Sequence, residues 1–263
     1  MPRIRSLFNV AILSVLLSSA PLALRSSPAQ AQSLGANIPA EWTTDANFQP
    51  GDVGQPGGRE GGAVRSTCTY GDTPLTVLVP ENGLGKTTEP YPTFLAYIPR
   101  NIASSLEFTL ETADGDELYK ATFNSVQTSV PSDSDTETPK PDALAKTSTS
   151  PGIASLSLPA NAALTPLEIG KDYRWRFTLK CGGVPIFARG WVRRVEKSAD
   201  LVAKLAQASD RDRVNIYIEA GLWNDALATL DNLRRSEPDD RSITTALEDL
   251  LRAANLNKVV DAI

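Results

Sequence analysis

Histidine is absent from this sequence of 263 residues, and cysteine occurs only twice. Histidine is the side chain most often used for general acid–base catalysis near neutral pH. The sequence also has no Cys-x-x-Cys pair, no Gly-x-Ser-x-Gly nucleophile elbow and no cluster of metal ligands. We therefore predict that the protein is not an enzyme and that it uses no cofactor and no metal ion.

Paired carboxylates are the catalytic groups that remain to be considered. Glycosidases use two such groups, and Glu107 with Glu111, or Asp114 with Asp116, could form a pair. A solvated strand face explains the first pair more simply, and a hairpin turn explains the second. A carboxylate-based hydrolase is therefore a minor alternative.

The N-terminus has the order of segments found in a secretory signal. Two arginines precede an apolar run over residues 8–17, and the small-residue site Ala-Gln-Ala ends at Ala31. No arginine pair precedes the apolar run and no cysteine follows it, which disfavours twin-arginine export and a lipid anchor. Pro21 and Arg25 interrupt the run before it could span a bilayer. We predict a signal peptide over 1–31, export to the periplasm, cell envelope or extracellular space, and no stable membrane insertion after cleavage.

Charge and cysteine content fit such a compartment. The formal net charge is −5, and removal of residues 1–31 takes away three arginines, which makes it −8. A mildly acidic chain is disfavoured as a nucleic-acid binder. In an oxidising compartment, Cys68 and Cys181 are expected to form one disulfide.

The chain after the signal divides into three parts. Residues 32–65 are rich in glycine and proline and are expected to form a flexible linker. Their glycine cluster lacks the Lys-Ser/Thr ending of a phosphate-binding loop. Residues 66–197 show mostly strand periodicity with short runs and turn signals, so the sequence predicts a mainly β fold, an immunoglobulin-like β-sandwich with one disulfide. Residues 198–263 change to helical periodicity and predict a short α-helical tail.

A polar stretch interrupts the predicted sandwich. Residues 124–150 are rich in serine, threonine, proline and aspartate, which is typical of a disordered insertion. Two aspartates, Asp133 and Asp135, could suggest a calcium loop. The stretch lacks the glycine and the terminal glutamate of such a loop, so calcium binding is a minor alternative.

The strand expected over residues 171–181 carries the strongest candidate site. Tyr173, Trp175 and Phe177 alternate with charged residues, so the aromatic side chains should face the core. Residues 171–197 contain eight basic and two acidic side chains, which is the only strong charge asymmetry in the chain. The candidate binding residues on the outward positions of this strand and the next one are Arg174, Arg176, Lys180, Arg189 and Arg193.

Two interpretations of this basic face are open. It could hold the acidic helical tail, where residues 199–263 contain eight basic and twelve acidic side chains. Otherwise it could bind an acidic protein or an anionic envelope polysaccharide, because arginine has a planar fork that suits carboxylates.

The helical tail contains a second candidate residue, Trp223. Residues 221–227, Gly-Leu-Trp-Asn-Asp-Ala-Leu, look like the turn and second helix of a tetratricopeptide repeat, although only half of a repeat is matched. One such unit cannot bury its own apolar face, so the helices must pack on the sandwich, on a second copy or on a partner. Trp223 is either a core residue of this tail or the exposed anchor of a protein interface.

Several motifs together resemble a known family of exported proteins, domain of unknown function 928 (DUF928), which is common in cyanobacteria. The motifs are Gly-Gly-Arg-Glu-Gly-Gly at 57–62 with Arg65 and Cys68, and the runs at 75–80, 92–94, 152–159, 170–181, 190–195 and 220–227. The insertion at 124–150 departs from the family pattern, which makes it a poor candidate for a shared site. The resemblance implies an exported protein and assembly with envelope partners, and it implies no catalytic residue.

These observations predict a noncatalytic envelope protein. Its most favoured role is to bind or help to assemble another exported protein. Binding of an anionic envelope polysaccharide through the basic strand face is the alternative.

Overall fold

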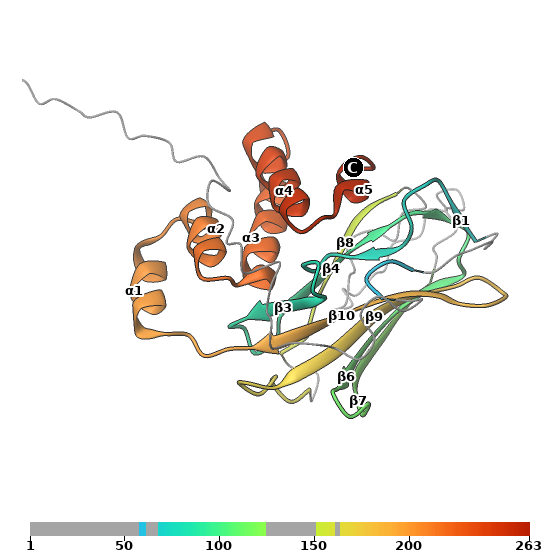
Figure 1. Ribbon diagram of the computed structural model, residues 1–263, viewed down its shortest axis with the longest axis horizontal. Coiled ribbons are helices and arrows are strands. Elements are labelled where there is room, and N and C mark those ends of the chain that lie inside the picture. The colour runs from blue at the N-terminus through green and yellow to red at the C-terminus, as the bar shows by residue number, and fades with distance from the viewer. Residues whose placement is uncertain (1–57, 62–67, 125–150, 161–163) are drawn as a thin grey trace, which may run out of the picture. The chain divides into compact units, whose positions relative to one another are not determined.

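The computed structural model describes residues 58–61, 68–124, 151–160 and 164–263, all of which belong to one compact unit, Ser33–Ile263 (Figure 1). The predicted signal peptide, most of the predicted linker and nearly all of the predicted insertion lie outside the described residues. Within them, strands occupy the chain up to Arg194 and helices follow from Ala199. The predictions of a mainly β fold and of C-terminal helices are therefore confirmed.

The strands form three sheets. The five-stranded sheet has the order β3 (Leu84–Thr87), β10 (Ile186–Arg194), β9 (Asp172–Lys180), β6 (Ser105–Thr112) and β7 (Glu117–Asn124). The three-stranded sheet has the order β2 (Thr76–Val77), β4 (Thr93–Ile98) and β8 (Gly152–Ser157). Short strands β1 (Thr69–Tyr70) and β5 (Arg100–Asn101) form a pair of their own. All neighbours are antiparallel except β3 and β10, which run parallel.

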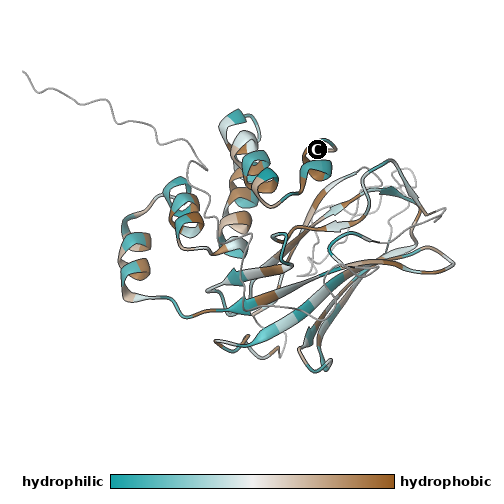
Figure 2. Ribbon diagram, viewed as in Figure 1, coloured by the Kyte–Doolittle hydropathy of each residue, from teal (hydrophilic) through white to brown (hydrophobic). Residues whose placement is uncertain are grey.

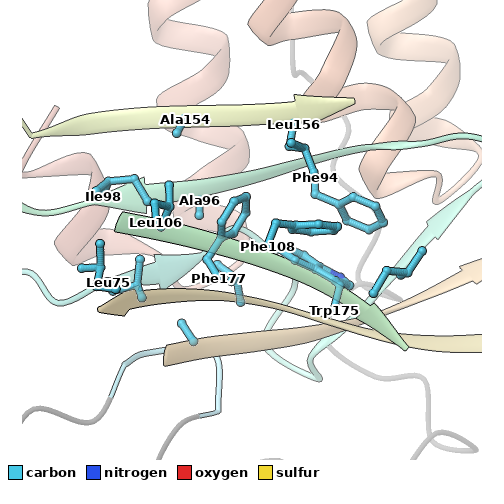
Figure 3. Close-up of a cluster of buried hydrophobic side chains, with 14 of the residues drawn as sticks. Leu75, Phe94, Ala96, Ile98, Leu106, Phe108, Ala154, Leu156, Trp175 and Phe177 are labelled. Carbon is cyan, nitrogen blue, oxygen red and sulfur yellow. The ribbon is translucent and has the colours of Figure 1, made fainter. Parts of the chain in front are cut away.

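An aromatic core joins the five-stranded and three-stranded sheets. Phe108, Trp175 and Phe177 point inward from the large sheet and meet Phe94 of the small sheet (Figure 3). The ring centroids of Phe94 and Trp175 are 4.8 Å apart. Gly190 makes room for this packing, since a Cβ atom there would lie 3.3 Å from the Trp175 ring. The alternation predicted for β9 is confirmed, because its aromatic side chains are buried and its charged side chains face outward.

Most of the helices lie on the other side of the small sheet, whereas the first of them packs on the second helix. They are α1 (Ala199–Gln207), α2 (Asp210–Glu219), α3 (Trp223–Ser236), α4 (Arg241–Ala253) and α5 (Asn257–Val260). Leu78, Leu95 and Tyr97 form one buried cluster with leucines of α3 and α4. Every residue of β4 from Phe94 to Ile98 is buried, because β4 lies between the aromatic core and the helices. Figure 2 shows that hydrophobic and hydrophilic residues alternate along these helices.

Three consecutive side chains at the start of α3 contact the two sheets. Trp223 is fully buried, and its indole N–H donates to the Leu78 carbonyl at 2.8 Å. Asp225 accepts hydrogen bonds from the hydroxyl groups of Thr87 and Thr88 and from the Thr88 backbone N–H. Asn224 lies against Gly85, where a Cβ atom would meet the Asn224 side-chain oxygen.

Residues 58–61 of the predicted linker are instead part of the fold. The Gly61 N–H donates to the Leu75 carbonyl at 2.6 Å, and the Val77 N–H donates to the Arg59 carbonyl at 2.9 Å. This segment therefore pairs along the edge of β2. The Arg59 guanidinium reaches the end of α4, where it donates to the carbonyls of Ala254 and Asn255 at 2.6 and 3.1 Å. The flexible-linker prediction is therefore wrong for residues 58–61, because polar backbone pairing orders a segment that has few apolar side chains.

A disulfide joins Cys68 to Cys181, as predicted, with a Cα–Cα distance of 5.7 Å. It connects the segment before β1 to the residue that follows β9. None of the described helices has the length and apolar character needed to cross a membrane.

Candidate binding face

The outer face of the five-stranded sheet brings five of the six candidate residues together. The outward positions of β9 carry Arg174, Arg176 and Lys180, and those of β10 carry Arg189 and Arg193. The register between the two strands pairs Arg176 with Arg189. We call this surface the basic face.

Two carboxylates from β6 lie beneath these cations. The β6–β9 register places Glu111 opposite Arg174, and the guanidinium donates to one Glu111 oxygen at 2.9 and 2.6 Å. The other oxygen lies 3.2 Å from the guanidinium of Arg176. The Glu111 side chain is 10% exposed, so one buried carboxylate fixes the positions of two arginines. Charge-assisted pairs of this kind are geometrically specific because the planar fork of arginine matches a carboxylate.

The second carboxylate, Glu107, holds two lysines. Lys180 and Lys120 place their ammonium groups 2.7 and 3.3 Å from the same Glu107 oxygen. Burial raises the pKa of Glu107, but the hydrogen bonds from Lys180 and Lys120 outweigh it, so the pKa lies below the usual value for glutamate. Glu107 is therefore a charged acceptor, which suits a structural role and not that of a catalytic acid.

The cations on this face outnumber the carboxylates. Asp172 binds Arg193 through two hydrogen bonds of 2.6 and 2.8 Å. Among the described residues, Glu107, Glu111 and Asp172 pair with five cations of the face, which also carries Arg189; the five are Lys120, Arg174, Arg176, Lys180 and Arg193.

Two aromatic residues of the face were not among the sequence candidates. Trp191 and Phe187 occupy outward positions of β10 and are partly exposed. The guanidinium of Arg174 lies 5.9 Å from the Trp191 ring centroid, and that of Arg189 lies 5.9 Å from the Phe187 ring centroid. The signal was present in the sequence, since the period of two that places Arg189 and Arg193 outward also places these rings there. Aromatic rings therefore alternate with guanidinium groups along the outward positions of β10, in the order Phe187, Arg189, Trp191 and Arg193.

The interpretation that the basic face holds the acidic helical tail is wrong. The carboxylate partners of the basic face come from β6 and β9, whereas α2 to α5 share a buried cluster with the far side of the three-stranded sheet and α1 packs on α2. The tail is attached through apolar packing and through the hydrogen bonds of Trp223 and Asp225 at the start of α3. The opposite charges of the basic face and the tail therefore do not bring them together.

The sixth candidate, Trp223, lies away from this face. It is 0% exposed and its indole N–H is hydrogen-bonded to Leu78, so it is a core residue and the interpretation as an exposed anchor is wrong. Within the described ranges, no group of three or more histidine, cysteine or acidic side chains could hold a metal ion. The candidate calcium residues Asp133 and Asp135 lie outside those ranges.

A family model described as Domain of Unknown Function (DUF928) matches residues 60–263. The chain belongs to this family. The DUF928 match begins at Glu60, in the segment that pairs with β2, and covers the described strands and helices, the basic face included. No curated protein matches the chain.

Proposed function

We propose that this DUF928 protein is an exported, noncatalytic binding protein of the cell envelope and that its basic face binds an acidic polysaccharide. The observation that carries the proposal is the arrangement of guanidinium groups and aromatic rings on one face of the sheet. Arg174 and Arg176 are held in place by a buried carboxylate, so little side-chain entropy is lost when they bind a carboxylate of the ligand. The rings of Trp191 and Phe187 offer flat apolar surface to the sugar rings.

The proposal includes an immunoglobulin-like architecture for the two packed sheets. Two observations support it. In the large sheet, a parallel edge strand is followed by two antiparallel hairpins, and the small sheet contains β2, β4 and β8. The hydroxyl of Tyr173, at the start of β9, accepts a hydrogen bond at 2.9 Å from the backbone N–H of Glu168, five residues upstream. Immunoglobulin-like domains have a tyrosine corner of this kind.

Export and the absence of catalysis belong to the same proposal. The N-terminal signal pattern and the disulfide are typical of proteins in oxidising compartments. Two cations hold each of the carboxylates Glu107 and Glu111, which favours a structural role over that of a hydrolase pair.

Retention on immobilised polymers tests the polysaccharide proposal. We expect the protein to bind polygalacturonate but not neutral dextran, with binding that weakens as salt is raised. Combined replacement of Arg176→Ala and Arg189→Ala should weaken binding roughly tenfold or more, because two charge-assisted contacts contribute on the order of 1.4 kcal/mol. Trp191→Ala should also weaken it, without a change in charge.

The matched control is Arg252→Ala on α4, which removes a guanidinium that pairs with Glu248 and Asp249 on the helical side of the molecule. It should leave retention unchanged. Equal retention on both polymers, or an equal loss for Arg252→Ala and for the double variant, would contradict the proposal.

Binding to another exported protein is a second candidate function. It is favoured by apolar side chains exposed near the disulfide, namely Tyr70, Ile102 and Val184, of which Val184 is 87% exposed. The segments that carry them are linked, because Ile102 donates its N–H to Cys68 and the disulfide joins Cys68 to Cys181. Capture of one envelope protein that survives high salt and the Arg176→Ala and Arg189→Ala replacements would favour this candidate.

A further inference from the structure

The two packed sheets have four edges, and three of them carry features that prevent pairing with another strand. Exposed strand edges are usually covered or charged, because their unpaired backbone groups attract other strands. The segment 59–61 pairs along β2, and the start of α3 packs against β3. The β7 edge carries Glu117 and Lys120. The fourth edge, β8, reads Gly-Ile-Ala-Ser-Leu-Ser and has no charged side chain.

The β8 edge also presents a regular row of backbone groups. Leu158 donates its N–H to Pro92 on the β4 side. Backbone groups alternate in direction along an antiparallel strand, so the N–H and C=O groups of Ile153, Ser155 and Ser157 face away from β4. Among the described residues, β4 is the sole strand that pairs with β8.

We propose that β8 pairs antiparallel with β8 of a second copy of this chain. A twofold axis at Ser155 would pair Ser155 with its own copy and Ile153 with Ser157, which would satisfy every outward backbone group of the edge. The strand can pair with itself because none of its own side chains is charged, and the guanidinium of Arg235 on α3, which donates to the Ser155 hydroxyl, is paired with Asp231. Pro151 and Pro159 bracket the segment and limit the pairing to this length.

The dimer would have a consequence for ligand binding. An antiparallel pair of identical strands has its twofold axis perpendicular to the sheet, so the two small sheets become one and both large sheets lie on the same side of it. The two basic faces would then point in the same direction. One polysaccharide chain could contact both, which raises the apparent affinity through effective concentration. This consequence rests on the proposed function, whereas the pairing itself does not.

Cysteine cross-linking tests the register. Directly opposed, hydrogen-bonded residues in an antiparallel pair have Cα atoms about 5.5 Å apart, which is within disulfide range. Ser155→Cys should therefore form a covalent dimer under mild oxidation, seen on a non-reducing gel. Ser157→Cys is the matched control, because residue 157 would face Ile153 and not its own copy. Absence of a covalent Ser155→Cys dimer, or equal cross-linking of both variants, would overturn the proposal.

Solution mass gives an independent test. The purified protein should have twice the mass of one chain by light scattering at micromolar concentration. Ser155→Pro should give the mass of one chain while the melting temperature stays near that of the wild type, because the N–H that it removes faces away from β4. A wild-type protein with the mass of one chain, or a Ser155→Pro variant that stays dimeric, would overturn the proposal. Both results are independent of polysaccharide, so they separate failure of the dimer from failure of the proposed function.

Discussion

Asp225 shows how one buried carboxyl group links stability to pH. It is 5% exposed. Burial raises its pKa, and the hydrogen bonds from Thr87 and Thr88 offset only part of this effect. A folded-state pKa above the unfolded value means that the folded state binds the proton more tightly. The contribution of Asp225 to stability is therefore fully present below the usual aspartate pKa and is lost as pH rises through the raised value.

Replacement of Asp225→Asn should remove this pH dependence. A neutral amide can accept from the Thr88 N–H and donate to the Thr87 hydroxyl, so the hydrogen bonds between the start of α3 and the end of β3 can be kept. We expect the variant to be at least as stable as the wild type at neutral pH, measured by urea unfolding over a pH series. A clear loss of stability at neutral pH would show that the charged carboxylate stabilises the fold.

The matched variant Asp225→Ala separates hydrogen bonding from charge. It leaves the buried N–H of Thr88 without its acceptor, and an unsatisfied buried donor costs about 1 to 3 kcal/mol. The free energy of unfolding should fall at every pH. A variant as stable as Asp225→Asn would contradict the role assigned to these hydrogen bonds.

At the scale of elements, the contact between α3 and β3 depends on the absence of a side chain at Gly85. A Cβ atom there would lie 2.0 Å from the Asn224 side-chain oxygen, so Gly85→Ala should destabilise the protein by about 1 to 3 kcal/mol through overpacking. Asn224→Ala should restore much of the loss, since it removes the clashing atoms. Urea unfolding of both single variants and the double variant measures the coupling. Additive losses would contradict a direct contact.

The elements also show what sequence can and cannot predict. The period of two along β9 places Trp175 inside and Arg174 outside, because this alternation is local. The partner of Arg174 is Glu111, 63 residues earlier, and only the β6–β9 register brings them together. Leu201, Leu205, Val214 and Tyr217 have helical spacing, but the chain there forms two helices, α1 and α2, because Ser209 and Asp212 form a capping box that starts a new helix.

Other features could not be read from local patterns. Arg59 lies in a glycine-rich stretch with little to bury, and its ordering comes from acceptors at the far end of the chain. Trp223 fits both a core residue and an interface anchor by composition. Only the position of the Leu78 carbonyl, which comes from the fold, distinguishes the two.

At the scale of the whole molecule, the disulfide closes most of the β structure into one loop. Its cysteines are separated by 113 residues. A loop of this length gives a chain-entropy stabilisation of about 4 to 5 kcal/mol. Combined Cys68→Ser and Cys181→Ser replacement should lower the free energy of unfolding by up to this amount, measured by urea unfolding beside the oxidised wild type. A loss below about 1 kcal/mol would show that the open chain is already restricted.

The contacts of Arg59 and Glu60 with the C-terminal helices limit the order in which parts of this fold can form. Its acceptor Ala254 lies 195 residues further along the chain, and Glu60 pairs with Lys258 at a similar separation. A ribosome makes residue 59 long before these partners, so the edge of β2 and the end of α4 cannot be joined until residue 254 has been made. Contacts of such high sequence separation slow folding, because the loop between them must close before they give any stability. The closure between residue 59 and the end of α4 is therefore a late step of folding, which needs the strands and the helices between them to have been made.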